Sequence, residues 1–282
     1  MAPMPLLLAG LSAILYGLAD FSGGLASSRS PVLPVVLVSQ AAGLVLALAA
    51  IGIMGTPFPG GADLAWGLAA GLSGALGVAT LYRGLARSIV AVVSPVSALV
   101  GAFAPAAFGL ATGERLSAAA LVGAGLCLPA ILLLSLGGSG GGKRGSVASA
   151  LLQGLVAGLG FGGFFISSSR TGAASGLWPL AAARCASMAS LLVLLAATRR
   201  GIRVEPAARR ATLGSGLADM GANIFFLLAS RSGTLALASV VSSLYPLPTV
   251  ALGALAFKER VPPPRIAGIA LAVAGVALIS AG

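Results

Sequence analysis

Long apolar runs separated by short polar or Gly/Pro-rich segments dominate the chain. A helix rises about 1.5 Å per residue, so roughly 20 apolar residues cross the roughly 30 Å hydrocarbon core of a bilayer. Cutting the sequence at charges, prolines and glycine clusters leaves ten runs of about that length. The pattern therefore predicts ten transmembrane helices, over residues 5–27, 33–54, 64–82, 89–111, 117–136, 149–168, 177–197, 211–229, 234–256 and 265–281.

The composition supports a membrane protein and excludes most enzyme classes. Of 282 residues, 58% are hydrophobic and 8% are charged, and the mean hydropathy is +1.05; soluble domains have about 45–50% and about 25%. The chain has no histidine, which removes histidine acid–base chemistry, Ser-His-Asp triads and histidine metal sites. We expect an all-α integral membrane protein that is not an enzyme and uses neither cofactor nor metal.

The basic residues predict how the helices are oriented. The net charge is +11, but the 17 Lys and Arg residues, apart from Arg184, are scattered through the gaps between apolar runs, which fits loop orientation better than nucleic-acid binding. The loops on one side hold only Arg115, Arg170 and Arg231. The opposite loops hold Arg29, Arg83, Arg87, Lys143, Arg144, Arg199, Arg200, Arg203, Arg209, Arg210, Lys258, Arg260 and Arg265. The positive-inside rule makes this larger set cytoplasmic, so both termini are predicted to be periplasmic in an inner (plasma) membrane.

A glycine-rich segment over 137–148 divides the chain into halves of five predicted helices, 1–136 and 149–282. Its composition is that of a flexible connector. Gly137, Gly142 and Lys143 satisfy the spacing of a phosphate loop, but Arg144 stands where the magnesium-binding hydroxyl must be. An ATP-driven pump is therefore not expected.

The two halves resemble each other at a shift of 145 residues. Matched positions include Tyr16-Gly17 with Phe161-Gly162, Pro34 with Pro179, Ser94 with Ser239, Leu99 with Leu244, Glu114-Arg115 with Glu259-Arg260, and Gly123 with Gly268. Between the third and fourth helices the shift changes by two, so that Tyr82 pairs with Phe225. Because each half has an odd number of spans, the second half is predicted to cross the membrane inverted. Such repeats are typical of transporters with a site between the halves near the midplane.

These motifs resemble a known transporter family. Tyr16-Gly17, Phe161-Gly162, Pro179 with Arg184, the Ser243-Leu244-Tyr245-Pro246 run, Lys258-Glu259-Arg260 and Gly268 are similar to the EamA repeat of the drug/metabolite transporter superfamily. The second copy matches better, because the first has Ser39 in place of Arg184 and Gly101 in place of Pro246. The resemblance implies a ten-helix secondary carrier that exports amino acids, including aromatic ones, or related small metabolites. A multidrug or other metabolite exporter and a passive channel are the alternatives.

Three charges lie inside predicted helices, where each costs roughly 2.5–3.5 kcal/mol on insertion scales. Asp20 shares a helix face with Ser12 and Tyr16, which makes a polar stripe that we expect to face a central cavity. Asp20 is a candidate proton-coupling carboxylate. The alternative is a helix-end carboxylate that meets Arg29 or headgroup water.

The other two charges, Arg184 and Asp219, are predicted to form a buried pair between neighbouring antiparallel helices. In one interpretation, the pair neutralises the two charges and fixes the packing of the helices, and it has no other role. In the other interpretation, Arg184 faces the cavity and binds a substrate carboxylate, for which its planar guanidinium is suited. Asp219 is a second candidate for proton coupling.

Aromatic and amide side chains in the middle of helices complete the predicted substrate pocket. With Arg184, the candidates are Tyr16, Gln40, Tyr82, Phe161, Phe165, Asn223 and Tyr245, and Trp178 is either a further one or an interface anchor. Helix packing and lipid contact are the alternatives for each aromatic residue. The expected partners are a small-molecule substrate and membrane lipids, without nucleic acid, and the expected state is a monomer.

Overall fold

The computed structural model describes residues 3–87, 90–136, 146–199, 201–257 and 261–281; within them, the side chains of residues 3, 82, 84–87, 90 and 91 are not described. The described residues contain helices and no strand. The helices are α1 (Pro3–Ser27), α2 (Val32–Met54), α3 (Gly61–Arg87), α4 (Val90–Ala111), α5 (Ala118–Ser135), α6 (Val147–Ser169), α7 (Trp178–Ala197), α8 (Arg209–Ser232), α9 (Leu235–Ser242), α10 (Pro246–Phe257) and α11 (Pro263–Ala281), with short 3-10 turns at Ala173–Ser175 and Pro206–Ala208.

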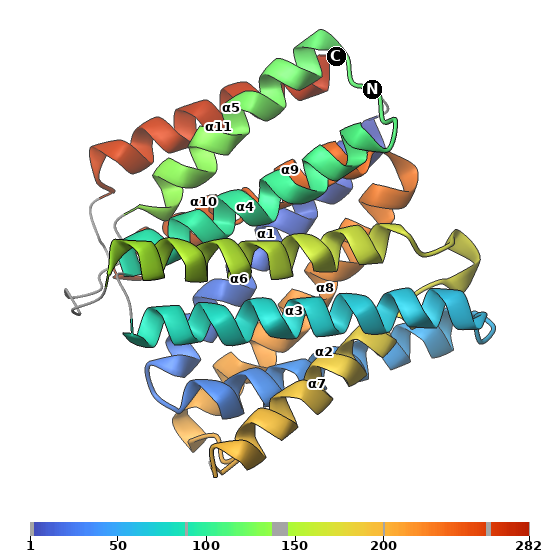
Figure 1. The fold of residues 1–282 in the computed structure, drawn as a ribbon, viewed down its shortest axis with the longest axis vertical. Coiled ribbons are helices and arrows are strands. Elements are labelled where there is room, and N and C mark those ends of the chain that lie inside the picture. Colours follow the sequence, from blue (N-terminus) through green and yellow to red (C-terminus); the bar gives the residue numbers. More distant parts are fainter. Residues whose placement is uncertain (1–2, 88–89, 137–145, 200, 258–260, 282) are drawn as a thin grey trace.

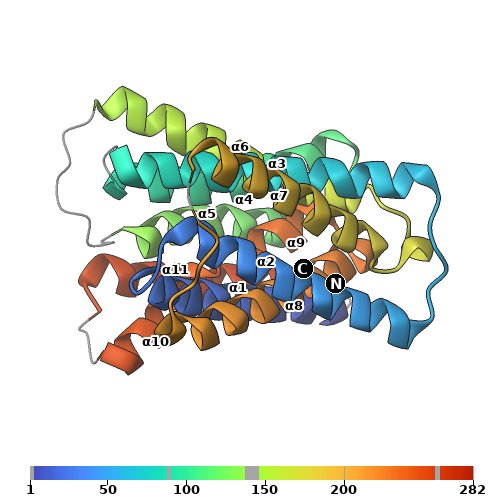
Figure 2. The ribbon, with the colours of Figure 1, turned by 90° about the horizontal axis from the view of Figure 1, so that it is seen from below.

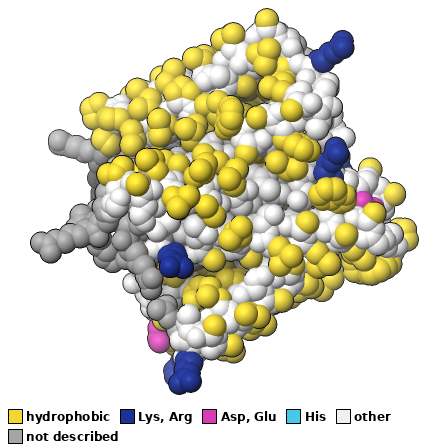
Figure 3. Space-filling view, in the orientation of Figure 1, with side chains coloured by type: hydrophobic (Ala, Val, Ile, Leu, Met, Phe, Trp, Pro, Cys, Tyr) yellow, Lys and Arg dark blue, Asp and Glu magenta, His cyan; other side chains and the backbone are white. Residues whose placement is uncertain are grey.

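The fold class predicted from the sequence is confirmed. Ten segments of the described chain are long and apolar enough to cross a membrane, and they coincide with the ten predicted runs to within a few residues. Apolar side chains cover most of the face shown in Figure 3, and Lys and Arg side chains lie toward the ends of the helices. This surface suits a bilayer, in which apolar side chains face lipid.

The ninth predicted helix differs from the prediction, because it is broken. α9 ends at Ser242 and α10 begins at Pro246, with a turn over 243–245. Proline has no N–H to donate, and its ring collides with the carbonyl group four residues earlier, here that of Ser242. The amide of Leu244 bonds instead to the carbonyl oxygen of Val241, 3.1 Å away, which tightens the turn.

The two halves of the chain interlock in a single bundle. The most extensive helix packings join one half to the other: α1 lies on α8, α6 on α3 and α4, α7 on α2 and α3, and α5 on α11. These packings correspond when the halves are exchanged, since α1 on α8 matches α6 on α3, and α2 on α8 matches α7 on α3.

The start of α1 and the end of α11 lie at the same end of the bundle (Figure 1). The connections from α2 to α3, α4 to α5 and α6 to α7 lie at this end as well. α5 ends and α6 begins at the opposite end, which the view from below also shows (Figure 2). The bundle therefore has one end that carries both termini, called here the terminal end.

Candidate functional site

The predicted pair between Arg184 and Asp219 forms. From α7, one terminal nitrogen of the Arg184 guanidinium donates to Oδ2 of Asp219 on α8, and the other donates to Oε1 of Gln40 on α2. Arg184 is only 8% exposed. A charge buried this deeply needs both neutralisation and hydrogen-bond partners, and the two neighbouring helices supply them.

Further hydrogen bonds extend this pair to α1. The amide nitrogen of Asn223 donates to the backbone oxygen of Asp219 at 2.6 Å and to Oδ2 of Asp219 at 3.2 Å. The hydroxyl of Tyr16 donates to Oδ1 of Asn223 at 2.9 Å, and that of Ser187 donates to Oε1 of Gln40 at 3.2 Å. The resulting polar network consists of Tyr16, Gln40, Arg184, Ser187, Asp219 and Asn223.

Helix periodicity explains how so few positions build the network. Asp219 and Asn223 are four residues apart on α8, and Arg184 and Ser187 are three apart on α7, so each pair shares a helix face. Tyr16 and Gln40 come from the first half of the chain and the other members from the second. The formal charges of Arg184 and Asp219 cancel.

An aromatic cluster adjoins the polar network through Tyr16. Its other members are Phe165, Phe226 and Tyr245. The rings of Phe165 and Phe226 are stacked with centroids 4.1 Å apart, and the Tyr16 ring lies 6.2 Å from Phe165 and 6.3 Å from Tyr245. Tyr16 therefore contributes its hydroxyl to the polar network and its ring to an apolar surface.

The glycine beside Tyr16 brings α1 close to the break between α9 and α10. A Cβ atom on Gly17 would lie 2.4 Å from Cγ of Pro248 and 2.8 Å from the backbone oxygen of Tyr245. The hydroxyl of Thr249 donates to the backbone oxygen of Gly17 at 3.2 Å. The Tyr-Gly pair thus combines a polar side chain with a close helix contact.

The polar stripe on α1 packs against α8. Ser12 is buried and its hydroxyl donates to the backbone oxygen of Ala222 at 2.9 Å, one turn from the bond between Tyr16 and Asn223. Asp20, at the other end of the stripe, is exposed and has no hydrogen-bond or ion-pair partner among the described residues. The stripe therefore reaches the network at Tyr16, and Asp20 extends beyond it.

Two of the predicted pocket residues, Phe161 and Trp178, lie outside both the polar network and the aromatic cluster. The ring of Phe161 packs against α3, where it fills the space beside Gly77, and the Cβ atom of Phe161 lies beside Gly101 of α4. The side chain of Tyr82 lies outside the described part of the structure. Trp178 donates from Nε1 to the backbone oxygen of Thr56 at 3.2 Å, and this contact joins the start of α7 to the connection between α2 and α3.

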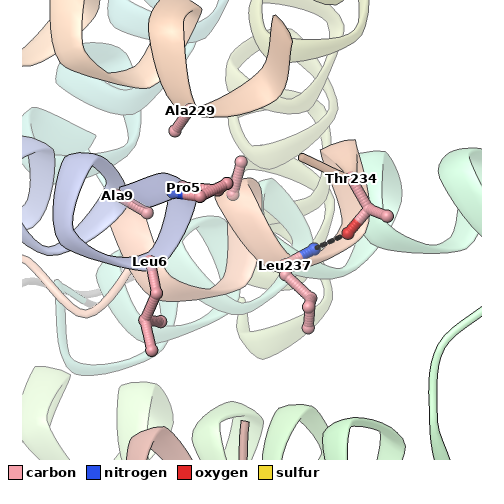
Figure 4. Close-up of a pocket in the computed structure, with 7 residues that line it drawn as sticks. Pro5, Leu6, Ala9, Ala229, Thr234 and Leu237 are labelled. Atoms are coloured by element: carbon pink, nitrogen blue, oxygen red, sulfur yellow. Dashed lines mark hydrogen bonds between the residues drawn. The ribbon is translucent and has the colours of Figure 1, made fainter. Parts of the chain in front are cut away.

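Two hollows on the described part of the chain contain no residue of the polar network. One is a narrow, mainly apolar crevice lined by Pro5, Leu6, Ala9, Ala229, Thr234, Leu237 and Ala238 (Figure 4). The second, called here the lateral groove, has a volume of about 390 Å³ and lies between α4, α5 and α9. Its lining residues, Phe103, Ala106, Ala107, Leu110, Leu116, Leu121, Ala124, Gly125, Leu128, Ala236 and Val240, are all apolar or glycine.

Glu114 has a role that the sequence did not reveal. Its carboxylate oxygens accept hydrogen bonds from the backbone N–H groups of Leu235 at 2.7 Å and Ala236 at 2.9 Å, the first two residues of α9. A carboxylate suits a helix N-terminus, where unpaired N–H groups and the helix dipole favour negative charge. A residue of the first half thus caps a helix of the second. Its repeat partner Glu259 lies outside the described residues.

Arg231 also does more than the charge count indicated. At the end of α8 it donates to the backbone oxygen of Gly176 at 2.8 Å, to the Thr171 hydroxyl at 2.9 Å and to the Ser175 hydroxyl at 3.1 Å. It therefore fixes the connection between α6 and α7. Position in a short loop gave no signal for this role, because the three acceptors lie at least 55 residues away in sequence.

The fold defines a multi-pass membrane protein with ten candidate spans. Residues 148–281 match the EamA-like transporter family, whose members are membrane transporters and not enzymes. No curated protein matches the chain. Among 27 matching chains of solved structures, one crystal structure is 19% identical, covers 98% of this chain and 98% of its own, and superposes with a TM-score of 0.76. At that identity, the likeness concerns the fold alone.

Proposed function

We propose that this transporter is a secondary carrier that exports a small metabolite, with amino acids as the first candidates, by alternating access around the polar network. One observation carries the proposal: the buried Arg184 pairs with the half-buried Asp219, and the amide and hydroxyl groups bonded to this pair come from both halves of the chain. Charged side chains inside membrane-spanning segments are rare, and they commonly mark the pathway of a substrate or an ion.

An inverted repeat of 1–136 and 149–282 underlies the proposed mechanism. The correspondence of helix packings under exchange of the halves supports it, as does the sequence match at a shift of 145 residues. Two related arrangements of one bundle can then open to opposite sides of the membrane. Of the connector over 137–148, residues 137–145 lie outside the described residues.

The chemistry of the network favours a zwitterionic substrate. Arg184 can bind a carboxylate with two parallel N–H donors, and Asp219, once released from Arg184, can accept an ammonium group. The rings of Tyr16, Phe165 and Tyr245 provide an apolar surface beside these charges, which suits an aromatic or aliphatic side chain. A substrate without a carboxylate, as in a multidrug or other metabolite exporter, would not need Arg184.

Asp20 and Asp219 are the proposed proton-coupling groups. Asp20 has no partner among the described residues, and Asp219 has a partner that a substrate carboxylate could take over. Loss of a pH-gradient effect in Asp20→Asn, with uptake retained, would assign coupling to Asp20.

Uptake of a labelled amino-acid panel into proteoliposomes, with and without a pH gradient, tests the proposal. The decisive variant is Arg184→Leu with Asp219→Leu, because it removes both charges and leaves neither stranded. If this folded variant has lost transport, the pair binds or couples substrate. If it transports normally, the pair serves packing only. A passive ion current through wild-type protein would instead favour a channel.

We further propose that the protein acts as a monomer in the inner (plasma) membrane. The basic loops support an orientation with the terminal end in the periplasm, since Arg115, Arg170 and Arg231 are the only basic residues assigned to its loops.

A further inference from the structure

The lateral groove is a concave site on a surface of exposed apolar side chains. Its walls carry Phe103, Leu110 and Leu121, whose side chains are 56%, 41% and 46% exposed. Between them lie small residues, among them Ala124, Gly125 and Ala236. The groove is hollow because these positions lack bulk: a Cβ atom on Gly125 would meet nothing within 4 Å. Figure 3 shows the face on which α4 and α5 lie, and the side chains there are largely hydrophobic.

The groove extends to the terminal end of the bundle. Its α4 wall reaches Leu110, one residue before α4 ends, and Leu116 lines it from the connection between α4 and α5. The preceding residue, Arg115, is exposed and forms no ion pair among the described residues. The carboxylate of the adjacent Glu114 accepts hydrogen bonds from two backbone N–H groups of α9. An exposed cation therefore directly precedes, in sequence, a residue that lines the end of the apolar groove.

We propose that the lateral groove is a phospholipid site, in which one acyl chain fills the groove and the phosphate binds Arg115. In the hydrocarbon layer an apolar hollow open to the side is accessible to acyl chains, and its lining offers no partner to a polar substrate. The planar guanidinium of an arginine can bind phosphate oxygens through two parallel N–H donors. This proposal does not depend on the substrate or the mechanism of transport.

Occupancy of the groove would stabilise α9. Ala236 and Val240 contribute to the lining, so the acyl chain contacts the helix that Glu114 caps and that breaks before Tyr245. The lipid thus completes the packing of α4, α5 and α9.

Native mass spectrometry of the detergent-solubilised protein titrated with phosphatidylglycerol tests the proposal. We expect one retained lipid on wild-type protein and loss of that lipid in Gly125→Leu, which adds bulk at a groove position where a Cβ atom meets nothing within 4 Å. Arg115→Gln should weaken binding about fivefold, the equivalent of about 1 kcal/mol for one basic residue near anionic headgroups. The matched control is Gly52→Leu on exposed α2, where a Cβ atom also meets nothing within 4 Å; it should bind like wild type.

Three outcomes would overturn the proposal. Equal lipid retention in Gly125→Leu and wild type excludes the groove. Unchanged affinity in Arg115→Gln excludes the phosphate contact. A wild-type dimer that Gly125→Leu converts to monomer assigns the groove to a second copy of the chain. If Gly125→Leu does not fold, Ala107→Leu from the α4 wall tests the same groove.

Discussion

The hydroxyl of Tyr16 and the side-chain amide of Asn223 meet across the boundary between the halves, with 2.9 Å between Tyr16 Oη and Asn223 Oδ1. Asn223 in turn donates to Asp219, which pairs with Arg184. The Tyr16 ring meanwhile contacts Tyr245 in the turn between α9 and α10. One side chain therefore connects the buried charges to the broken helix.

Tyr16→Phe removes only the hydroxyl, so we expect a loss of about 0.5–1.5 kcal/mol in unfolding free energy, the usual contribution of one hydrogen bond. If the network binds substrate, the transport rate of the folded Tyr16→Phe variant should also fall below that of wild type. Tyr245→Phe is the matched control, because the Tyr245 hydroxyl has no hydrogen bond among the described residues. Chemical unfolding in detergent and proteoliposome uptake measure the two effects. Equal effects of both variants would argue against a special role for the Tyr16 hydroxyl.

Asp219→Ala should reduce the unfolding free energy by about 3–5 kcal/mol, because it leaves the Arg184 charge buried without its counter-ion. Replacing both residues with Leu should restore most of that loss. Thermal unfolding of the two variants side by side measures the difference. A double variant as unstable as Asp219→Ala would show that the stranded charge is not the cause.

Gly17→Ala should destabilise the protein by about 1–3 kcal/mol, because the added methyl group collides with Pro248 and the backbone of Tyr245. Gly10→Ala is the control on the same helix: its Cβ atom meets nothing within 4 Å, and alanine favours helix by up to about 1 kcal/mol. The two variants should therefore shift the melting temperature in opposite directions. A neutral Gly17→Ala would contradict the close contact between α1 and α10.

Glu114→Ala should cost about 0.5–2 kcal/mol, the range for loss of a helix N-cap. Glu114→Gln keeps an oxygen acceptor but loses the charge, so it should cost less. Hydrogen exchange can localise the effect. We expect faster exchange at the amides of Leu235 and Ala236, whose N–H groups donate hydrogen bonds to Glu114. Unchanged exchange at these two amides would contradict the capping role.

The C-terminus should be periplasmic. A fused reporter that works only in the periplasm should therefore be active, and one that works only in the cytoplasm should be inactive. The basis is the excess of Lys and Arg in the loops of the opposite end. Paired fusions that are active in the periplasm or in the cytoplasm make the measurement. Activity of the cytoplasmic reporter would invert the proposed orientation. It would also invert the side of the membrane from which a proton reaches Asp20.

The number of helices and the buried ion pair could be predicted from the sequence because both follow from the cost of placing polar groups in hydrocarbon. An isolated Arg184 in an apolar run requires a partner, and Asp219 was the near candidate. The break before Pro246 was missed because the apolar run continues through it, and membrane helices tolerate proline when neighbours satisfy the freed backbone groups. Hydropathy reports the length of a span but not its continuity.

Contacts between distant segments could not be predicted in this way. Glu114 and Leu235 are 121 residues apart, and their contact exists only because α4 and α9 pack together. Likewise, nothing local to Ser187 or Phe226 distinguishes them from other small or aromatic residues on their helices. The repeat drew attention to Glu114, but the partner of its carboxylate depends on the assembled bundle.

The interlocking of the halves determines when the protein can assemble. Each membrane helix satisfies its own backbone hydrogen bonds, so the first five can enter the bilayer as they are synthesised. The partner of Ser12, however, lies 210 residues later in the chain, and α5 packs on α11 of the second half. The early helices must therefore remain in the membrane without their final neighbours until the second half has been synthesised. The first half expressed alone should insert but stay unassembled, exposed to quality-control proteolysis until the second half is supplied.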